Sequence, residues 1–253
     1  KLKPDYVVIA SSTSLHREQL EFLDEKLNGR TILVEKPLFD NYYEMNVNNN
    51  RVFVGYNLRF HPLIQKVRDI LSGRKLWNLQ AFCGSYLPDW RPDRDYKETS
   101  SAVKEAGGGV LLDLSHELDY LQWLAGPINI EHAFNQKISS LEINSDDILL
   151  LSGKSDLGAR IHVSLNYFSR NPMRQLLIDG EGISIQADLV KNFLSVVEEG
   201  KASDYSWEKL DRNSMYKAQH LAAIQDSSSA ICSYEEGLET MILIEKIRSH
   251  CKL

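Results

Sequence analysis

The first 55 residues alternate between short apolar runs and a helix-like segment, and this alternation limits the fold more than any other feature. Residues 5–10 and 31–34 are apolar, β-branched runs typical of buried parallel strands. The segment between them carries apolar residues at helical spacing, and a third run at 52–55 follows an Asn-rich link at 46–50. This order predicts an α/β unit with a parallel sheet.

The pattern changes after His61-Pro62, which opens a helix. The remainder predicts a mostly antiparallel sheet with helices on one face, so we expect an α/β unit over residues 1–60 and an α+β unit over 61–253. The C-terminal helix is expected to be able to pack back on the first unit. The predicted strands are 76–86, 129–137, 146–155, 159–168, 174–182 and 183–189, and the helices are 110–124, 212–229 and 234–250.

Charge and cysteine content exclude several classes of partner. The net charge of -6 and the absence of a basic run argue against nucleic acid. Cys83, Cys232 and Cys251 form no CxxC pair, so no metal is expected and a reducing compartment fits. No apolar stretch approaches the ~20 residues that span a bilayer. We expect a cytoplasmic protein that contacts no membrane.

Small and charged residues follow two of the predicted strands. Ser11, Ser12 and Thr13 follow the first strand, and Glu35-Lys36-Pro37 follows the second. Ligands of open α/β sheets bind at these carboxyl ends. Lys36 there can donate a hydrogen bond to an alcohol oxygen and stabilise a developing alkoxide. The alternatives are that the serines only cap a helix and that Lys36 is solvated.

His116 is the candidate base. Its usual pKa of ~6.5 suits proton transfer near neutral pH. In a single helix over 110–124 it would share a face with Asp113 and Asp119, and Gly107–Gly109 before that helix allows close backbone approach. The alternative is a structural histidine. Arg59, His61 and Tyr86 are further candidates for substrate contact because they lie on loops or at strand ends.

Four stretches together resemble the Gfo/Idh/MocA oxidoreductases, the group of glucose–fructose oxidoreductase and inositol dehydrogenase. They are Val-Ile-Ala-Ser-Ser-Thr-Ser-Leu-His at 8–16, Val-Glu-Lys-Pro at 34–37, Gly-Tyr-Asn-Leu-Arg-Phe-His-Pro at 55–62 and Gly-Gly-Gly-Val-Leu-Leu-Asp-Leu-Ser-His-Glu-Leu-Asp at 107–119. Each is weak alone, but their order and spacing are specific. The resemblance runs from about residue 4 to the C-terminus.

The resemblance implies a nicotinamide-dependent oxidoreductase that uses NAD or NADP, acts on a carbohydrate and forms a homodimer or homotetramer through its open sheet. It implies an incomplete Rossmann-type sheet followed by the open-sheet domain. The implied catalytic residues are Lys36, His116 and Asp113. The implied cofactor contacts are Ser11, Ser12, Thr13, His16, Glu35, Lys36, Trp90 and Arg91. The expected substrate contacts are Arg59, His61, Tyr86 and Asp119.

Residues 88–96, Pro-Asp-Trp-Arg-Pro-Asp-Arg-Asp-Tyr, resemble the branch of that family found with surface-polysaccharide and nonulosonic-acid sugar genes. The implied substrate is a sugar, a sugar acid or a nucleotide sugar, and the alternative is an ordinary charged loop. One departure concerns Asp113: many relatives have the acid four residues before the histidine, whereas here it stands three before His116.

The glycine fingerprint G-x-G-x-x-G of dinucleotide folds does not occur in the chain. By resemblance, residues 5–10 correspond to the fourth strand of a Rossmann sheet, so we expect strands one to three to be missing and Val7-Val8-Ile9 to form an exposed apolar edge. Two explanations compete, a piece of a longer protein and a naturally shortened relative. We favour the first, because Lys1 is not a natural start.

Two other functions remain open. A non-catalytic sugar-binding or scaffold relative is favoured by the missing fingerprint and opposed by Lys36 and His116. A hydrolase or isomerase on the same fold is also compatible, because redox chemistry on a bound dinucleotide can serve a reaction with no net oxidation.

Overall fold

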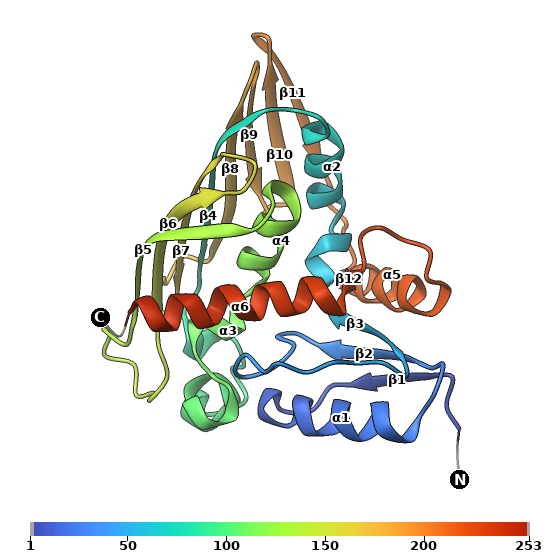
Figure 1. Cartoon of the computed structure of the whole chain (residues 1–253). Coiled ribbons are helices and arrows are strands. Elements are labelled where there is room, and N and C mark those ends of the chain that lie inside the picture. Colours follow the sequence, from blue (N-terminus) through green and yellow to red (C-terminus); the bar gives the residue numbers. More distant parts are fainter. Residues whose placement is uncertain (1–2, 252–253) are drawn as a thin grey trace.

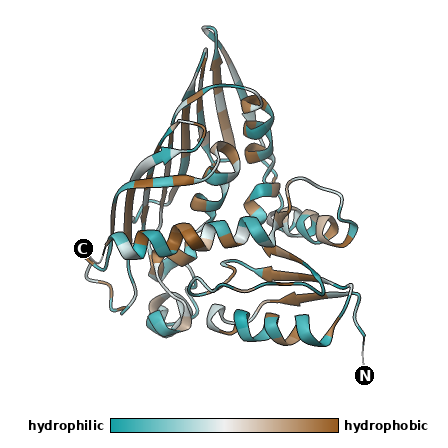
Figure 2. Ribbon diagram, viewed as in Figure 1, coloured by the Kyte–Doolittle hydropathy of each residue, from teal (hydrophilic) through white to brown (hydrophobic). Residues whose placement is uncertain are grey.

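Three parallel strands form the smaller of two sheets. The computed structural model describes residues 3–251. β1 (Tyr6–Ile9), β2 (Thr31–Glu35) and β3 (Arg51–Gly55) pair in that order, and α1 (His16–Lys26) connects the first two. The central β2 is buried along almost its whole length, which explains why its sequence does not alternate. Figures 1 and 2 show these strands as a largely hydrophobic layer over α1.

β1 forms one edge of this sheet. Over residues 3–251 it pairs with β2 alone. Val8 is 39% exposed and, with Leu15 and Phe22, lines a hollow of about 630 Å³. Ile9 is only 3% exposed, because alternate side chains of a strand point to opposite faces and Ile9 faces the core. The expectation of an exposed apolar side chain at this edge is therefore confirmed for Val8 and wrong for Ile9.

The rest of the chain contributes a second sheet, the helices beside it and several short 3-10 helices. The strands of this second sheet are β4 (Leu76–Gly84), β5 (Ile128–Gln136), β6 (Ile148–Ser155), β7 (Arg160–Asn166), β8 (Met173–Gly180), β9 (Ile183–Asp188), β10 (Phe193–Glu198) and β11 (Lys201–Ser206), and a further strand, β12 (Cys232–Ser233), belongs to the first sheet. The α-helices are α2 (Pro62–Leu71), α3 (Val110–Asp113), α4 (His116–Ala125), α5 (Arg212–Gln225) and α6 (Tyr234–His250). The 3-10 helices are η1 (Thr13–Leu15), η2 (Asn57–Phe60), η3 (Leu87–Asp89), η4 (Tyr96–Glu98), η5 (Ser100–Ala102) and η6 (Lys104–Ala106).

A strand from near the C-terminus completes the first sheet. β12 pairs antiparallel with β3, on the side away from β2. α6 follows at once, and its first turn is closed by a capping box between Ser233 and Glu236. α6 packs against β3 of the small sheet and β5 of the large one (Figure 1). Residues 232–250 therefore contact both of the units expected from the sequence.

The larger sheet has eight strands in the order β11-β10-β9-β8-β4-β7-β6-β5, antiparallel except for the parallel pair β4 and β7. All six strands predicted in this half are present, with ends shifted by one or two residues. α4 packs on β4 and α6 on β5, both on one face of this sheet, whereas α5 packs on β2 of the small sheet (Figure 1). The predicted fold class, a Rossmann-type parallel sheet followed by an open, mostly antiparallel sheet, is confirmed.

The hairpin of β10 and β11 was not predicted. Phe193–Glu198 is short, and β11 (Lys-Ala-Ser-Asp-Tyr-Ser) carries almost no apolar residue and is largely exposed. A strand at the edge of a sheet buries little, so it leaves little hydrophobic pattern in the sequence.

Candidate active site

The loops that follow β1 and β2 are tied together by one buried histidine. The His16 side chain is 1% exposed, and its Nδ1 lies 3.1 Å from the Pro37 carbonyl while its Nε2 lies 3.2 Å from the Ser11 carbonyl. A neutral imidazole has a single N–H, so it donates to one of these oxygens at a time. The enclosed ring therefore fixes the two loops relative to each other, and its expected contact with the cofactor stays a prediction.

Lys36 leaves the end of β2 and reaches the other unit of the protein. Its Nζ donates to the main-chain carbonyl of Asp113 at 2.5 Å. Burial lowers the pKa of the Lys36 ammonium, and the charge of Asp113 opposes that effect. The Lys36–Pro37 peptide bond is cis.

The carbonyl of Asp113 is available because the expected helix over 110–124 is broken. In a continuous α-helix this carbonyl would accept from the Glu117 N–H. Instead, Glu117 N donates to the Leu114 carbonyl at 3.3 Å, and α4 begins afresh at His116. The prediction of one helix, with Asp113 and His116 on a common face, is therefore wrong. The break releases the acceptor that holds Lys36.

His116 is the first residue of α4 and keeps one open ring nitrogen. Its Nδ1 is enclosed and has no hydrogen-bond partner within the described structure, whereas Nε2 is not enclosed. The Tyr56 ring meets the imidazole edge-on at a centroid distance of 5.6 Å. Burial lowers the pKa of His116 well below 6.5, and the nearby charges of Lys36 and then Arg174 lower it further. The structure thus brings Lys36 and His116 together.

The Asp113 carboxylate is held by a tyrosine that the sequence did not single out. The Tyr167 hydroxyl donates to Oδ2 of Asp113 at 2.6 Å. The Trp90 ring lies edge-on to the Tyr167 ring at 5.3 Å, and Trp90 Nε1 donates to Ser85 Oγ at 2.8 Å. The predicted Trp90 is therefore linked to Asp113 through Tyr167. Arg91 is exposed beside it and lines a small hollow.

An ion pair that includes Glu117, the residue after His116, was also not predicted. Arg174 of β8 binds Glu117 through Nε at 2.6 Å and Nη2 at 3.0 Å. Glu117 has no exposed surface, while the Arg174 side chain is 23% exposed. The two residues are far apart in sequence, and nothing in the pattern around residue 174 marks an arginine that faces the site.

Three residues predicted to contact substrate have protein partners instead. Arg59 and Asp119, exposed by 2% and 1%, form two hydrogen bonds at 3.0 and 2.7 Å, and Arg59 Nη1 donates to Glu236 at 2.7 Å. His61 accepts from Leu63 N at 3.1 Å and caps α2, with its Nε2 3.1 Å from Asn192 Oδ1. In this structure the polar atoms of these enclosed side chains are satisfied by the protein, and their contact with substrate stays a prediction.

The other candidates lie nearer the surface. The half-buried Tyr86 accepts a hydrogen bond from Arg170 at 3.2 Å, and the guanidinium stacks on its ring. Ser11 and Ser12 are exposed, and the Ser12 side chain forms no helix cap, which argues against the alternative role as a cap. Ser11 Oγ donates to Gln19 at 2.8 Å.

The glycines before α3 allow close approach to neighbouring protein atoms. A Cβ on Gly107 would lie 2.9 Å from Thr13 Cβ, and one on Gly108 would lie 2.1 Å from the Ser100 carbonyl. Gly109 has φ +116°, and its Cβ would lie 2.1 Å from Oδ1 of Asp146, whose other carboxylate oxygen accepts from Leu111 N at 2.9 Å. These glycines therefore fix where α3 begins.

Gly109→Ala is expected to lower the free energy of unfolding by about 2–4 kcal/mol, because it adds a clash with Asp146 to backbone strain of about 1–3 kcal/mol. Gly158→Ala is the matched control: Gly158 has φ +94°, and a Cβ there would have no neighbouring atom within 4 Å, so it reports strain alone. Urea denaturation of both variants measures the difference. Equal losses would contradict the role assigned to the contact with Asp146.

Comparisons with solved structures show the class of this fold. The NADH complex of levoglucosan dehydrogenase superimposes with a TM-score of 0.81 at 18% identity, over 98% of this chain and 77% of that one. The WlbA dehydrogenase of Bordetella pertussis, in complex with NADH and UDP-GlcNAcA, gives 0.75 at 19% identity, over 98% and 77%. UDP-N-acetylglucosamine 3-dehydrogenase GnnA of Acidithiobacillus ferrooxidans gives 0.72 at 17%, over 97% and 78%. The chain has the fold of this class of dehydrogenases.

Sequence comparison then gives the family. Residues 64–186 match the family described as the GFO/IDH/MocA C-terminal domain, and the predicted resemblance is confirmed. An uncharacterized oxidoreductase of Synechocystis sp., sll0816, is 32% identical over 129 residues, 48% of this chain. The match spans 34% of that relative's length.

Two further features are absent from the described residues. Between residues 3 and 251, no helix combines the length and apolar character needed to cross a membrane. In the same part of the chain, no group of three or more His, Cys, Asp or Glu side chains is arranged to hold a metal ion.

Proposed function

We propose that this chain belongs to an NAD(P)-dependent oxidoreductase that interconverts a CH–OH group and a carbonyl of a sugar, sugar acid or nucleotide sugar, in the cytoplasm and in surface carbohydrate metabolism. One observation carries the proposal. Lys36, at the end of a parallel strand, bonds to the carbonyl of Asp113, and its charge acts on the imidazole of His116. The family match and the dehydrogenase fold support the same reading.

The two side chains have complementary roles in this proposal. His116 presents an unenclosed Nε2, and its lowered pKa keeps the ring neutral, so it accepts the hydroxyl proton. The Lys36 ammonium donates to the same oxygen and stabilises the negative charge that develops there. A bound nicotinamide would supply the hydride acceptor.

The strand ends fit the nicotinamide half of such a cofactor. Ser11 and Ser12 are exposed at the end of β1, and Glu35 is half-buried at the end of β2, where burial raises its pKa. Gly55 at the end of β3 leaves room for the Glu35 side chain, since a Cβ there would lie 3.0 Å from Glu35 Oε2. We expect Ser11, Ser12, Thr13 and Glu35 to contact that half. The sequence contains no G-x-G-x-x-G segment for the pyrophosphate.

The direct test is a titration of the full-length protein with NADH and NADPH, followed by tryptophan fluorescence. Trp90 is 36% exposed and linked to Asp113 through Tyr167, so binding is expected to change its emission. Saturable binding of one dinucleotide supports the proposal and selects NAD or NADP. No binding of either at millimolar concentration would favour the non-catalytic sugar-binding or scaffold function, for which the missing glycine fingerprint speaks. Product analysis with catalytic amounts of recycled dinucleotide separates net oxidation from isomerisation.

His116→Gln is expected to lower kcat of the full-length enzyme by about 100-fold or more, because glutamine fills a similar space without accepting a proton. His250→Gln is the matched control, since His250 is the partly exposed last residue of α6. Steady-state kinetics with a confirmed substrate measure both. A His116 variant that turns over like the His250 control would refute the assignment.

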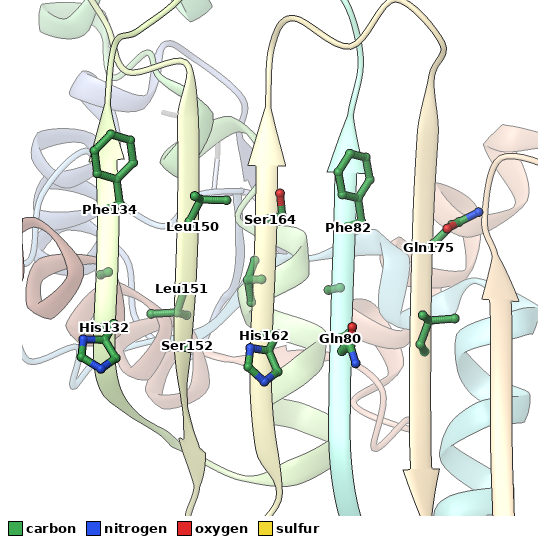
Figure 3. Close-up of a pocket in the computed structure, with 14 residues that line it drawn as sticks. Gln80, Phe82, His132, Phe134, Leu150, Leu151, Ser152, His162, Ser164 and Gln175 are labelled. Carbon is green, nitrogen blue, oxygen red and sulfur yellow. The ribbon is translucent and has the colours of Figure 1, made fainter.

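We also propose that the open face of the large sheet joins copies of this chain into a homodimer or homotetramer. Figure 3 shows Phe82, Phe134 and Leu150 on this face, beside a row formed by His132 and His162. Side chains of this kind at the centre of a sheet usually gain a partner surface. Light scattering of wild type and Leu150→Asp tests this: an unchanged mass in the variant would contradict it.

A further inference from the structure

Two nitrogens of the Arg174 guanidinium are hydrogen-bonded to Glu117, and the third is not. Its Nε and Nη2 donate to the two oxygens of Glu117. Its Nη1 has no hydrogen-bond partner between residues 3 and 251 and is not among the enclosed polar atoms. The 23% exposure of this side chain, beside a Glu117 with none, is consistent with an open Nη1. A protein acceptor for that nitrogen is thus absent from the described structure.

Nη1 of Arg174 lies near the two proposed catalytic groups, Lys36 and His116. Glu117 directly follows His116 at the start of α4, so a guanidinium gripped by Glu117 stands next to that turn. Burial lowers the pKa of His116, and the charges of Lys36 and Arg174 are the further causes. Burial likewise lowers the pKa of Lys36, and Arg174 again acts in the same direction. Lys36 bonds to the carbonyl of Asp113, three residues before His116, and Arg174 bonds to Glu117, the residue after it, so both cations are held by neighbours of His116 in the chain.

The charge felt at the imidazole is positive. Both charges that perturb His116 are cations, although the Glu117 carboxylate follows it in the chain. The two carboxylate oxygens of Glu117 are fully buried and accept hydrogen bonds from Nε and Nη2 of Arg174, so neither of them bonds to Nη1. A ligand group that enters between His116 and Arg174 is stabilised if it carries negative charge.

We infer that Arg174 is a specificity-determining residue whose Nη1 binds a carboxylate of the substrate, so that the enzyme prefers sugar acids over neutral sugars. The inference rests on the proposed function and narrows its substrate class. Glu117 is the positioning residue: its two hydrogen bonds fix the guanidinium plane and direct Nη1 outward. A lysine at position 174 would supply the charge without that fixed plane.

The test compares two matched ligands in the full-length protein saturated with NADH. UDP-N-acetylglucosaminuronate and UDP-N-acetylglucosamine differ by a carboxylate in place of a hydroxymethyl group, and D-glucuronate and D-glucose form a smaller pair with an equivalent difference. Calorimetry is expected to show at least tenfold tighter binding of the acid than of the neutral member. In the double variant Glu117→Gln/Arg174→Gln, affinity for the acid should fall at least tenfold, while affinity for the neutral sugar changes less than twofold.

The double variant is used because removal of Arg174 alone leaves a buried carboxylate unpaired, which endangers the fold. Arg74→Gln/Glu198→Gln removes another Arg–Glu pair, at the surface, and serves as the control. Circular dichroism and NADH affinity verify that each variant is folded. In steady-state kinetics, the double variant Glu117→Gln/Arg174→Gln should have a raised KM for the acid, while kcat stays within a few-fold.

The outcomes are distinct. Equal affinity of the wild type for acid and neutral sugar, or a preference that survives in the double variant, overturns the inference and leaves the proposed function standing. NADH binding with no affinity for any of these carbohydrates contradicts the carbohydrate substrate itself, and the inference falls with it. No NADH binding contradicts the proposed oxidoreductase.

Discussion

Lys36→Met is expected to lower kcat of the full-length enzyme by about 100-fold or more, with a smaller effect on KM for the dinucleotide. Methionine keeps the length and apolar stem of the side chain but removes the ammonium that bonds to the Asp113 carbonyl. The developing alkoxide would then lose its cationic donor. Steady-state kinetics at saturating substrate measure the loss.

The pH profile separates this role from a structural one. Burial lowers the Lys36 pKa from its usual 10.5, so kcat/KM of the wild type should fall on the alkaline side at a pH below that value. The variant should lack this alkaline limb. Lys26→Met is the control, because Lys26 is exposed and pairs with the neighbouring Glu25. A Lys36 variant with wild-type turnover and an unchanged profile would refute the proposed role.

Arg59→Met is expected to lower the free energy of unfolding by about 3–5 kcal/mol. It removes the partner of a carboxylate that is 1% exposed, Asp119, and a further bond to Glu236. A buried charge left without its partner retains its full desolvation cost, which is why the effect exceeds the worth of the ion pair itself.

Chemical denaturation measures this change, and the surface pair of Arg51 and Asp226 provides the control. Both of those side chains are about half exposed, at 52% and 53%, so Arg51→Met should cost at most about 1 kcal/mol. Restoring neutrality with Arg59→Met/Asp119→Leu should recover part of the loss. Similar losses for Arg59→Met and Arg51→Met would contradict the assigned structural role of Arg59.

Local patterns sufficed for much of the fold. The apolar run at 31–34 predicted a buried strand, and this strand predicted that Lys36 lies at the carboxyl end of the parallel sheet. The break between α3 and α4 could not be predicted, since Leu-Leu-Asp-Leu-Ser-His-Glu is compatible with an uninterrupted helix. The two-residue β12 is likewise too short to leave a periodic pattern.

Side-chain partners were the least predictable part of the site. Arg59 stands at a suggestive place after β3, but its position was decided by Asp119 and Glu236, which come from distant segments. Tyr167 and Arg174 were not predicted because their partners, Asp113 and Glu117, also come from distant segments. Pairings of this kind depend on how helices and strands that are distant in sequence pack together, and no local pattern encodes that arrangement.

The pairing of β12 with β3 has a consequence for the way this protein is made. β3 is translated well before the strand that covers its outer side, which belongs to residues 232–233. Chains on the ribosome fold from the N-terminus as they emerge, so one side of β3 stays uncovered until that strand emerges. Chaperones that bind nascent chains would meet this surface on every copy during that interval.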